Sequence, residues 1–178
     1  MTSEPIDTRT AFALLLETAC EQFSALRELI RGNLTIAVRT DRAGQNGQIS
    51  ILRAASCIQM ALAKAFLFNA VRSYRICEHA PNEIAVSKDE RKAFLKALRC
   101  IVNVRDVNEH GYDSKKGPRG RSARPLIHIH KSESAAVDET SLIILGPDRI
   151  LMGPLNLADV YVPVGAMRQI AGFGALPK

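Results

Sequence analysis

The sequence predicts a mainly α fold, an antiparallel helical bundle that is followed by a small C-terminal antiparallel β-meander and a final helix. Apolar residues recur at helical spacing through the N-terminal part of the 178-residue chain, and short apolar runs between turn residues follow it. With 47% hydrophobic residues, the chain can bury one ordinary core. We therefore expect the bundle at 8–113, a basic loop at 114–124, and the meander with its helix at 125–178, packed on the bundle.

The first two helices are predicted from their apolar periodicity. In Thr10–Arg31 the apolar residues step by four and three and form one stripe, and Gly32–Asn33 is a typical helix stop. After a break at Gly44–Gly47, a second helix over Gln48–His79 is apolar on several faces, so we expect it in the middle of the bundle. The stripe of the first helix consists of Phe12, Leu16, Ala19, Phe23, Leu26 and Ile30.

A third helix is predicted to begin near Lys88. Ser87 and Glu90 stand at the spacing of a capping box, in which each side chain accepts from the backbone N–H of the other residue. We expect this helix to carry the polar segment 105–112. Its apolar stripe advances by four and three and consists of Phe94, Leu98 and Ile101.

The C-terminal part of the chain changes character beyond Asp113. Segment 114–124 is rich in Gly, Ser and positive charge, which predicts a mobile loop. Short strands are expected at 126–130, 141–145 and 149–152, the last two joined through a turn at 146–148. The closing helix is predicted over 156–173 with Pro163 in its first turn. Its apolar positions are Val160, Val164, Met167 and Ile170.

Composition and charge indicate the kind of partner, the cellular location and the state of the cysteines. The formal charge of +6 favours an acidic partner. The polar, acidic N-terminus is unlike a secretory signal, and no uncharged apolar run approaches the roughly 20 residues of a membrane span, so we expect a cytoplasmic protein without a membrane anchor. The four cysteines lie in apolar helical patterns without zinc or redox spacing, and we expect buried, reduced thiols. They are Cys20, Cys57, Cys77 and Cys100.

The predicted third helix carries the sharpest functional pattern. The positions that continue its apolar stripe are Arg105, Asn108 and Tyr112, so the stripe turns polar without leaving its face. A buried guanidinium is costly unless carboxylates, amides or phosphate surround it. This departure from a simple core helix points to a functional site.

An arginine and a histidine at one site suit cleavage of an RNA phosphodiester. Imidazole, with an unperturbed pKa of about 6.5, can take the 2′-hydroxyl proton or give one to the leaving oxygen. A guanidinium can stabilise the charge on the phosphorus oxygens. We therefore interpret His110 as the acid/base, Arg105 as the anion binder, and Asp106, four residues before His110, as the orienting residue. This chemistry requires neither a metal nor a cofactor.

The same segment resembles the signature of the HEPN superfamily, an Arg, usually followed by a polar residue, and then a His after four to six positions. Arg105, Asp106 and His110 match it in order, and Tyr112 extends the match to the Arg-x4-His-x-Tyr form of toxins paired with minimal nucleotidyltransferases. The resemblance covers roughly residues 10–113. In length the chain is more similar to uncharacterised bacterial HEPN-like proteins with a small β extension.

The resemblance implies a helical bundle that works as a metal-independent endoribonuclease in a toxin or defence setting. It also implies a homodimer, in which Arg and His from both subunits line one composite cleft. In the toxin pairs, a nucleotidyltransferase antitoxin silences the enzyme by adding AMP to the Tyr, so the resemblance nominates Tyr112 as the AMPylation site and such an antitoxin as a partner.

A second interpretation of the segment stays open. Arg105 with Glu109, and Asp106 with His110, can be simple intrahelical ion pairs. The chain would then be a catalytically inactive HEPN-like binding or interaction module, in which these residues and Asn108 form a structural polar network at the dimer interface. A small-molecule pocket between the bundle and the meander is a third alternative.

Two further patterns bear on ligands. The loop after the motif can supply phosphate contacts that position RNA without reading its sequence. His128 and His130 alternate along a predicted strand and so share one face, but no third metal ligand is evident, and we expect an edge-strand pair without metal. The candidate RNA-binding residues of the loop are Lys115, Lys116, Arg119, Arg121 and Arg124.

Overall fold

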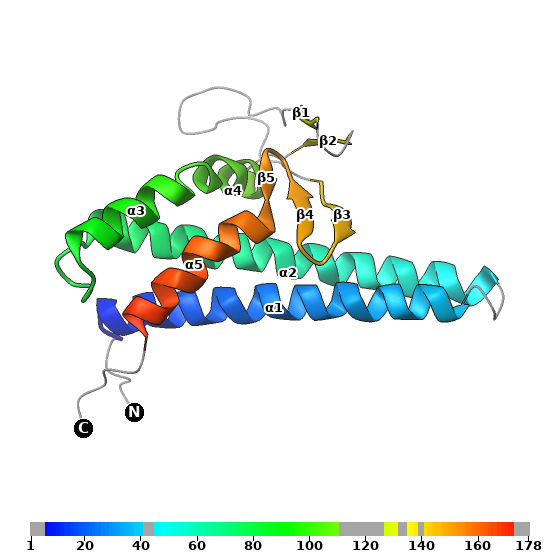
Figure 1. Cartoon of the computed structure of the whole chain (residues 1–178), viewed down its shortest axis with the longest axis horizontal. Helices are drawn as coiled ribbons and strands as arrows, with labels where there is room; N and C mark the ends of the chain where they lie inside the picture. Colours follow the sequence, from blue (N-terminus) through cyan, green and yellow to red (C-terminus); the bar gives the residue numbers. More distant parts are fainter. Residues whose placement is uncertain (1–5, 41–44, 111–126, 132–134, 139–140, 173–178) are drawn as a thin grey trace.

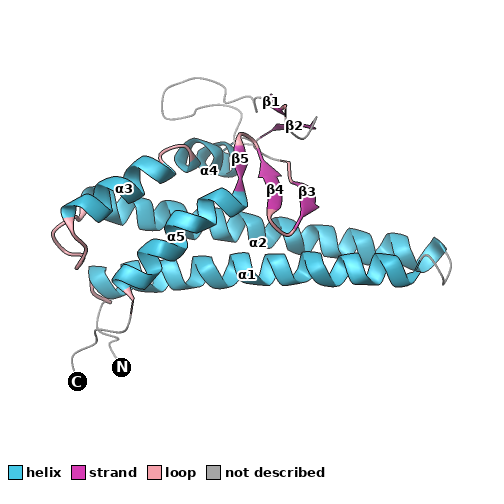
Figure 2. Cartoon of the chain, viewed as in Figure 1, coloured by secondary structure: helices cyan, strands magenta, loops and turns pink. Residues whose placement is uncertain are grey.

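The computed structural model describes residues 6–40, 45–110, 127–131, 135–138 and 141–172. Within it, two long helices form an antiparallel hairpin, the remaining helices lie across one part of that hairpin, and short strands lie beside them (Figures 1 and 2). The mainly helical fold with a small antiparallel sheet and a C-terminal helix is therefore confirmed.

The hairpin consists of α1 (Thr8–Thr40) and α2 (Gln45–His79), which lie side by side along their length (Figure 1). All six residues of the predicted α1 stripe are buried in the hydrophobic core. The expected stop at Gly32–Asn33 is wrong, because α1 continues through it. A glycine inside a helix costs only about 1 kcal/mol, and a Cβ added at Gly32 would meet nothing within 4 Å. The second helix begins at Gln45 rather than at Gln48.

The predicted third helix is two helices. The first, α3 (Lys88–Leu98), begins with the expected capping box, in which the backbone N–H of Glu90 donates to Ser87 Oγ over 3.3 Å and that of Ser87 donates to Glu90 Oε2 over 3.0 Å. The chain then turns at 99–100 and continues as α4 (Ile101–His110). The break places the motif on a separate short helix that packs on α2.

The strands form two small sheets rather than one meander. In the first, β1 (Ile127–His130) pairs antiparallel with β2 (Ala135–Asp138). The second has the order β3 (Ile143–Gly146), β4 (Arg149–Met152) and β5 (Leu155–Asn156), all antiparallel. The three expected strand regions and the turn between Gly146 and Arg149 are confirmed, whereas β2 and β5 were not predicted.

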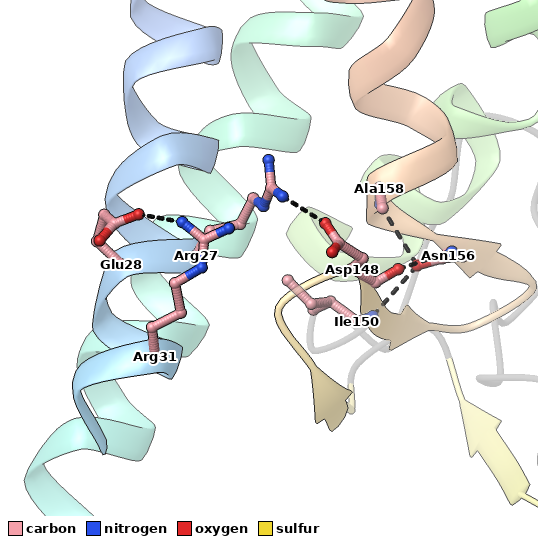
Figure 3. Close-up of polar contacts among 7 residues, drawn as sticks. All are labelled: Arg27, Glu28, Arg31, Asp148, Ile150, Asn156 and Ala158. Carbon is pink, nitrogen blue, oxygen red and sulfur yellow. Dashed lines mark hydrogen bonds and ion pairs between the residues drawn. The ribbon is translucent and has the colours of Figure 1, made fainter. Parts of the chain in front are cut away.

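The second sheet is attached to α1 at the turn between β3 and β4. Arg27 of α1 forms an ion pair with Asp148 of that turn over 2.6 Å (Figure 3). The side chain of Asn156 accepts a hydrogen bond from the backbone N–H of Ile150 and also caps the last helix by accepting from Ala158 N (Figure 3). One asparagine thus fixes the sheet and the start of the following helix.

The last helix, α5 (Leu157–Ala171), crosses α1 (Figure 1) and also contacts α3. Val160, Val164 and Met167 are buried as expected, but Ile170 is 44% exposed in the last turn. Pro163 lies inside the helix rather than in its first turn. A proline there removes one backbone hydrogen bond, and the burial of Val160 and Val164 on either side keeps the helix on the core.

The cysteines divide into two kinds. Cys20 and Cys77 are buried in the core, and burial raises the pKa of both thiols. Cys57 on α2 and Cys100 at the break before α4 are exposed, so the prediction that all four are buried is wrong for these two. Helical spacing alone did not show which face of α2 is left uncovered.

Candidate functional site

Helix α4 places Arg105 at the edge of the core. The neighbouring Val104 is 1% exposed and takes the core position that follows Ile101, while Arg105 is half-buried beside it. The sequence predicted that the apolar stripe becomes polar at Arg105. In the structure, Arg105 lies at the border of the core rather than inside it. The guanidinium reaches the surface of α2 while its stem is covered.

Arg105 contacts an aromatic side chain that the sequence pattern did not single out. Its guanidinium carbon lies 5.5 Å from the ring centroid of Phe68 on α2, and that of Arg72 lies 5.4 Å from the same centroid. Both separations are within the range of cation–π attraction. Phe68 therefore holds two guanidinium groups near one point of the molecular surface.

Spacing along α2 explains part of this cluster. Lys64, Phe68 and Arg72 follow one another at intervals of four residues and so lie on one face of the helix. Arg105 is added to that face by the packing of α4 on α2. The four-residue spacing was a signal in the sequence, but only the fold brings Arg105 to it.

A pocket of about 410 Å³ opens beside Arg105. Its volume is in the range of small-molecule sites. Two of its lining residues are cationic, and no carboxylate lines it among the described residues, so the pocket favours an anion. It lies between α1, α2 and α4 rather than between the bundle and a meander, and its lining residues are Gln22, Lys64, Ala65, Leu67, Phe68, Asn69 and Arg105.

The polar wall of the pocket is a pair of amides. Asn69 Nδ2 donates a hydrogen bond to Gln22 Oε1 over 2.9 Å, which joins α2 to α1. Both side chains are half-buried. The pocket therefore combines positive charge, an apolar surface that includes the ring of Phe68, and amide groups.

The side chains of the other residues of the predicted motif and of the basic loop lie outside the described part of the structure. Asp106, Asn108, Glu109 and His110 belong to α4, and their side chains lie outside the described part of the structure. Tyr112 and the five basic residues of the predicted loop at 114–124 also lie outside the described residues. Of the predicted catalytic set, the structure thus describes the surroundings of Arg105.

His130 of β1 lies outside the lining of the pocket beside Arg105. Nε2 of His130 lies 2.7 Å from the carbonyl oxygen of Gly153 and donates to it. His130 also lines a second pocket of about 440 Å³, together with Asp148, Arg149 and Asp159. This pocket has charges of both signs, and among the residues described, no three His, Cys, Asp or Glu side chains gather where they could hold a metal ion.

The chain was compared with protein-family models, with curated proteins and with solved structures. None of them matches. The assignment of a function therefore depends on the residues of the site. Among the described helices, none is long and apolar enough to cross a membrane.

Proposed function

We propose that this protein binds RNA at the pocket beside Arg105 and cleaves it in a metal-independent reaction of the HEPN type. The observation that supports the proposal is the position of Arg105, whose guanidinium lines an open pocket together with Lys64 and lies over the ring of Phe68. Guanidinium groups bind phosphate through two parallel hydrogen bonds, and a lysine beside them adds a point charge.

The cation–π contact of Arg105 with Phe68 supports binding in a second way. A guanidinium that already lies against a ring loses less side-chain freedom when it binds a phosphate. Lys64 is exposed, and it forms no ion pair with any residue that the structure describes, so its charge is available. Arg105 and Lys64 line the same pocket, so both charges can act on one phosphate group there.

In the proposed reaction, His110 takes the proton of a ribose 2′-hydroxyl, whose oxygen then attacks the adjacent phosphorus. The bond from phosphorus to the 5′-oxygen breaks, a cyclic 2′,3′-phosphate forms, and the leaving oxygen receives a proton. Arg105 stabilises the charge on the phosphorus oxygens, and Asp106 orients the imidazole. Because Arg105 and His110 lie around 140° apart on an ideal helix, we propose that a homodimer completes the cleft, with His110 from the partner subunit.

A binding module without catalysis is the second candidate. It is favoured by the contact of Arg105 with Phe68, because that contact is made within one subunit and needs no chemistry to explain it. In this case Glu109, Asn108 and Asp106 serve a structural polar network at a dimer interface, and the pocket binds RNA without cleaving it.

The deciding experiment is cleavage of total cellular RNA and tRNA by purified protein in EDTA. Wild type is compared with Arg105→Ala, His110→Ala and the control Lys92→Ala, which removes an exposed lysine of α3 away from the pocket. Cleavage that is lost in the first two variants and kept in the control establishes the enzyme. RNA binding that depends on Arg105, without cleavage, establishes the binding module.

The toxin setting is a separate part of the proposal. If Tyr112 is the target of a nucleotidyltransferase antitoxin, incubation of the two proteins with ATP adds one AMP, a mass increase that disappears in Tyr112→Phe. Failure of a nucleotidyltransferase encoded beside this gene to modify the chain rejects this partner and leaves the cleavage experiment unaffected.

A further inference from the structure

We infer that the amide pair of Gln22 and Asn69 recognises the edge of a nucleobase, so that the pocket takes a whole nucleotide rather than a phosphate alone. The inference rests on the proposed function for its RNA ligand and adds to it the part of the nucleotide that the pocket reads. It is carried by the geometry of the pair and by the composition of the pocket around it.

The amide pair leaves a donor and an acceptor available. Asn69 Nδ2 donates to Gln22 Oε1, which leaves Asn69 Oδ1 as an acceptor and Gln22 Nε2 as a donor. If both amides are turned over, the roles are exchanged but one donor and one acceptor still remain. Within the described part of the chain, neither amide makes another side-chain hydrogen bond. A half-buried pair of this kind gains from a ligand that offers the complementary groups.

The edges of nucleobases carry such groups. Each base presents hydrogen-bond donors and acceptors side by side, and asparagine or glutamine side chains bind them in bidentate fashion. Ribose and phosphate alone do not offer a flat edge of this kind. The amide pair therefore matches the base of a nucleotide whose phosphate is held elsewhere in the pocket.

The remaining lining residues fit the rest of a nucleotide. Lys64 and Arg105 supply positive charge for the phosphate, while Ala65 and Phe68 give an apolar surface for the ring. Lys64, Phe68 and Asn69 all belong to α2 and line the same pocket. A volume of about 410 Å³ is adequate for a small-molecule ligand.

The experiment measures binding of five probes to the full chain by calorimetric titration, namely the four nucleoside 5′-monophosphates and ribose 5-phosphate, which lacks the base. In wild type, at least one nucleotide should bind about fivefold or more tightly than ribose 5-phosphate, the factor that one bidentate base contact supplies. Asn69→Ala and Gln22→Ala should lose this advantage and keep the affinity for ribose 5-phosphate. The control Gln59→Ala, a half-buried amide of α2 outside the pocket, should behave as wild type.

The variant Gln22→Glu tests the inference even if the alanine variants fail to fold. In Gln22→Glu the carboxylate still accepts from Asn69 Nδ2, so the link between α1 and α2 is kept, but the donor at position 22 is gone. This variant should change the ratio of nucleotide to ribose 5-phosphate affinity, whatever the effect of its charge on both.

Each outcome separates the inference from the proposed function. If wild type binds ribose 5-phosphate as tightly as every nucleotide, or binds none of the five probes, the inference is wrong. If the advantage of the base persists in both alanine variants, it is wrong as well. A base advantage that depends on the amide pair, in a protein that neither binds nor cleaves RNA, supports the inference and rejects the proposed function.

Discussion

Replacing Arg105 with alanine should weaken RNA binding without unfolding the protein. The structural loss includes the contact with Phe68, and a cation–π contact of this kind contributes about 0.5–1 kcal/mol to the free energy of unfolding. The functional loss is one charge-assisted contact with phosphate, worth about 1.5–3 kcal/mol, which corresponds to roughly 10- to 150-fold in affinity.

The structure supplies a matched control in Arg72→Ala. Arg72 lies at nearly the same distance from the Phe68 ring as Arg105, 5.4 Å against 5.5 Å, but it does not line the pocket. Both variants should therefore lose the stability that the cation–π contact contributes, while only Arg105→Ala loses RNA affinity. Denaturation in urea measures the first effect, and fluorescence anisotropy with a labelled single-stranded RNA in EDTA measures the second.

Salt dependence sharpens the same experiment. For a single strand, the slope of log affinity against log salt concentration falls by about 0.7 for each phosphate contact that is removed. Arg105→Ala should reduce the slope by about this amount and Arg72→Ala should leave it unchanged. Equal weakening by both variants, or no weakening by either, would refute the assignment of Arg105 as the phosphate-binding residue of the pocket.

Three further predictions concern the fold. Phe23→Ala should lower the free energy of unfolding by about 3–5 kcal/mol, because this buried ring contacts Phe66 and Tyr161, and an unchanged melting temperature would contradict the described core. The hydrogen bonds from Ser87 lower the pKa of Glu90 below its ordinary value of 4.5. Wild type should therefore be more stable than Glu90→Gln above pH 4.5 and should lose that difference as the pH falls through the lowered pKa. Urea titrations at several pH values measure the difference in stability, and a difference that does not change with pH counts against the capping box. A maleimide should label Cys57 and Cys100 in the native protein and all four cysteines after denaturation, as counted by mass spectrometry; rapid native labelling of Cys20 or Cys77 would contradict their burial.

The sequence was most informative where one short pattern determines local structure. The capping box of Ser87 and Glu90 was predicted correctly because its two hydrogen bonds involve only neighbouring residues. The apolar stripe of α1 was also correct, since helical spacing defines a face whatever packs on it. Where a helix ends was harder to predict, because Gly32 is compatible both with a stop and with a continuing helix.

The candidate site was predictable only in part. The motif showed that Arg105 departs from an apolar pattern, but its neighbours Phe68 and Gln22 come from α2 and α1, far away in the chain. No local spacing relates residue 22 to residue 105. The break at 99–100 and the packing of α4 on α2 decide which side chains meet Arg105, and both depend on tertiary contacts.

The layout of the helices also has a consequence for the order in which the chain folds. Helices α1 and α2 follow one another in the chain and pack together, so their pairing closes only a short loop and is expected early. Helix α5 instead joins α1 across the whole sequence, as in the ion pair of Arg168 with Glu17, which are 151 residues apart. Until α5 docks, Phe23 lacks its stacking partner Tyr161 and remains open to solvent on that side. During synthesis on the ribosome, part of the apolar face of the hairpin therefore stays exposed until α5 has been synthesised and docks on it.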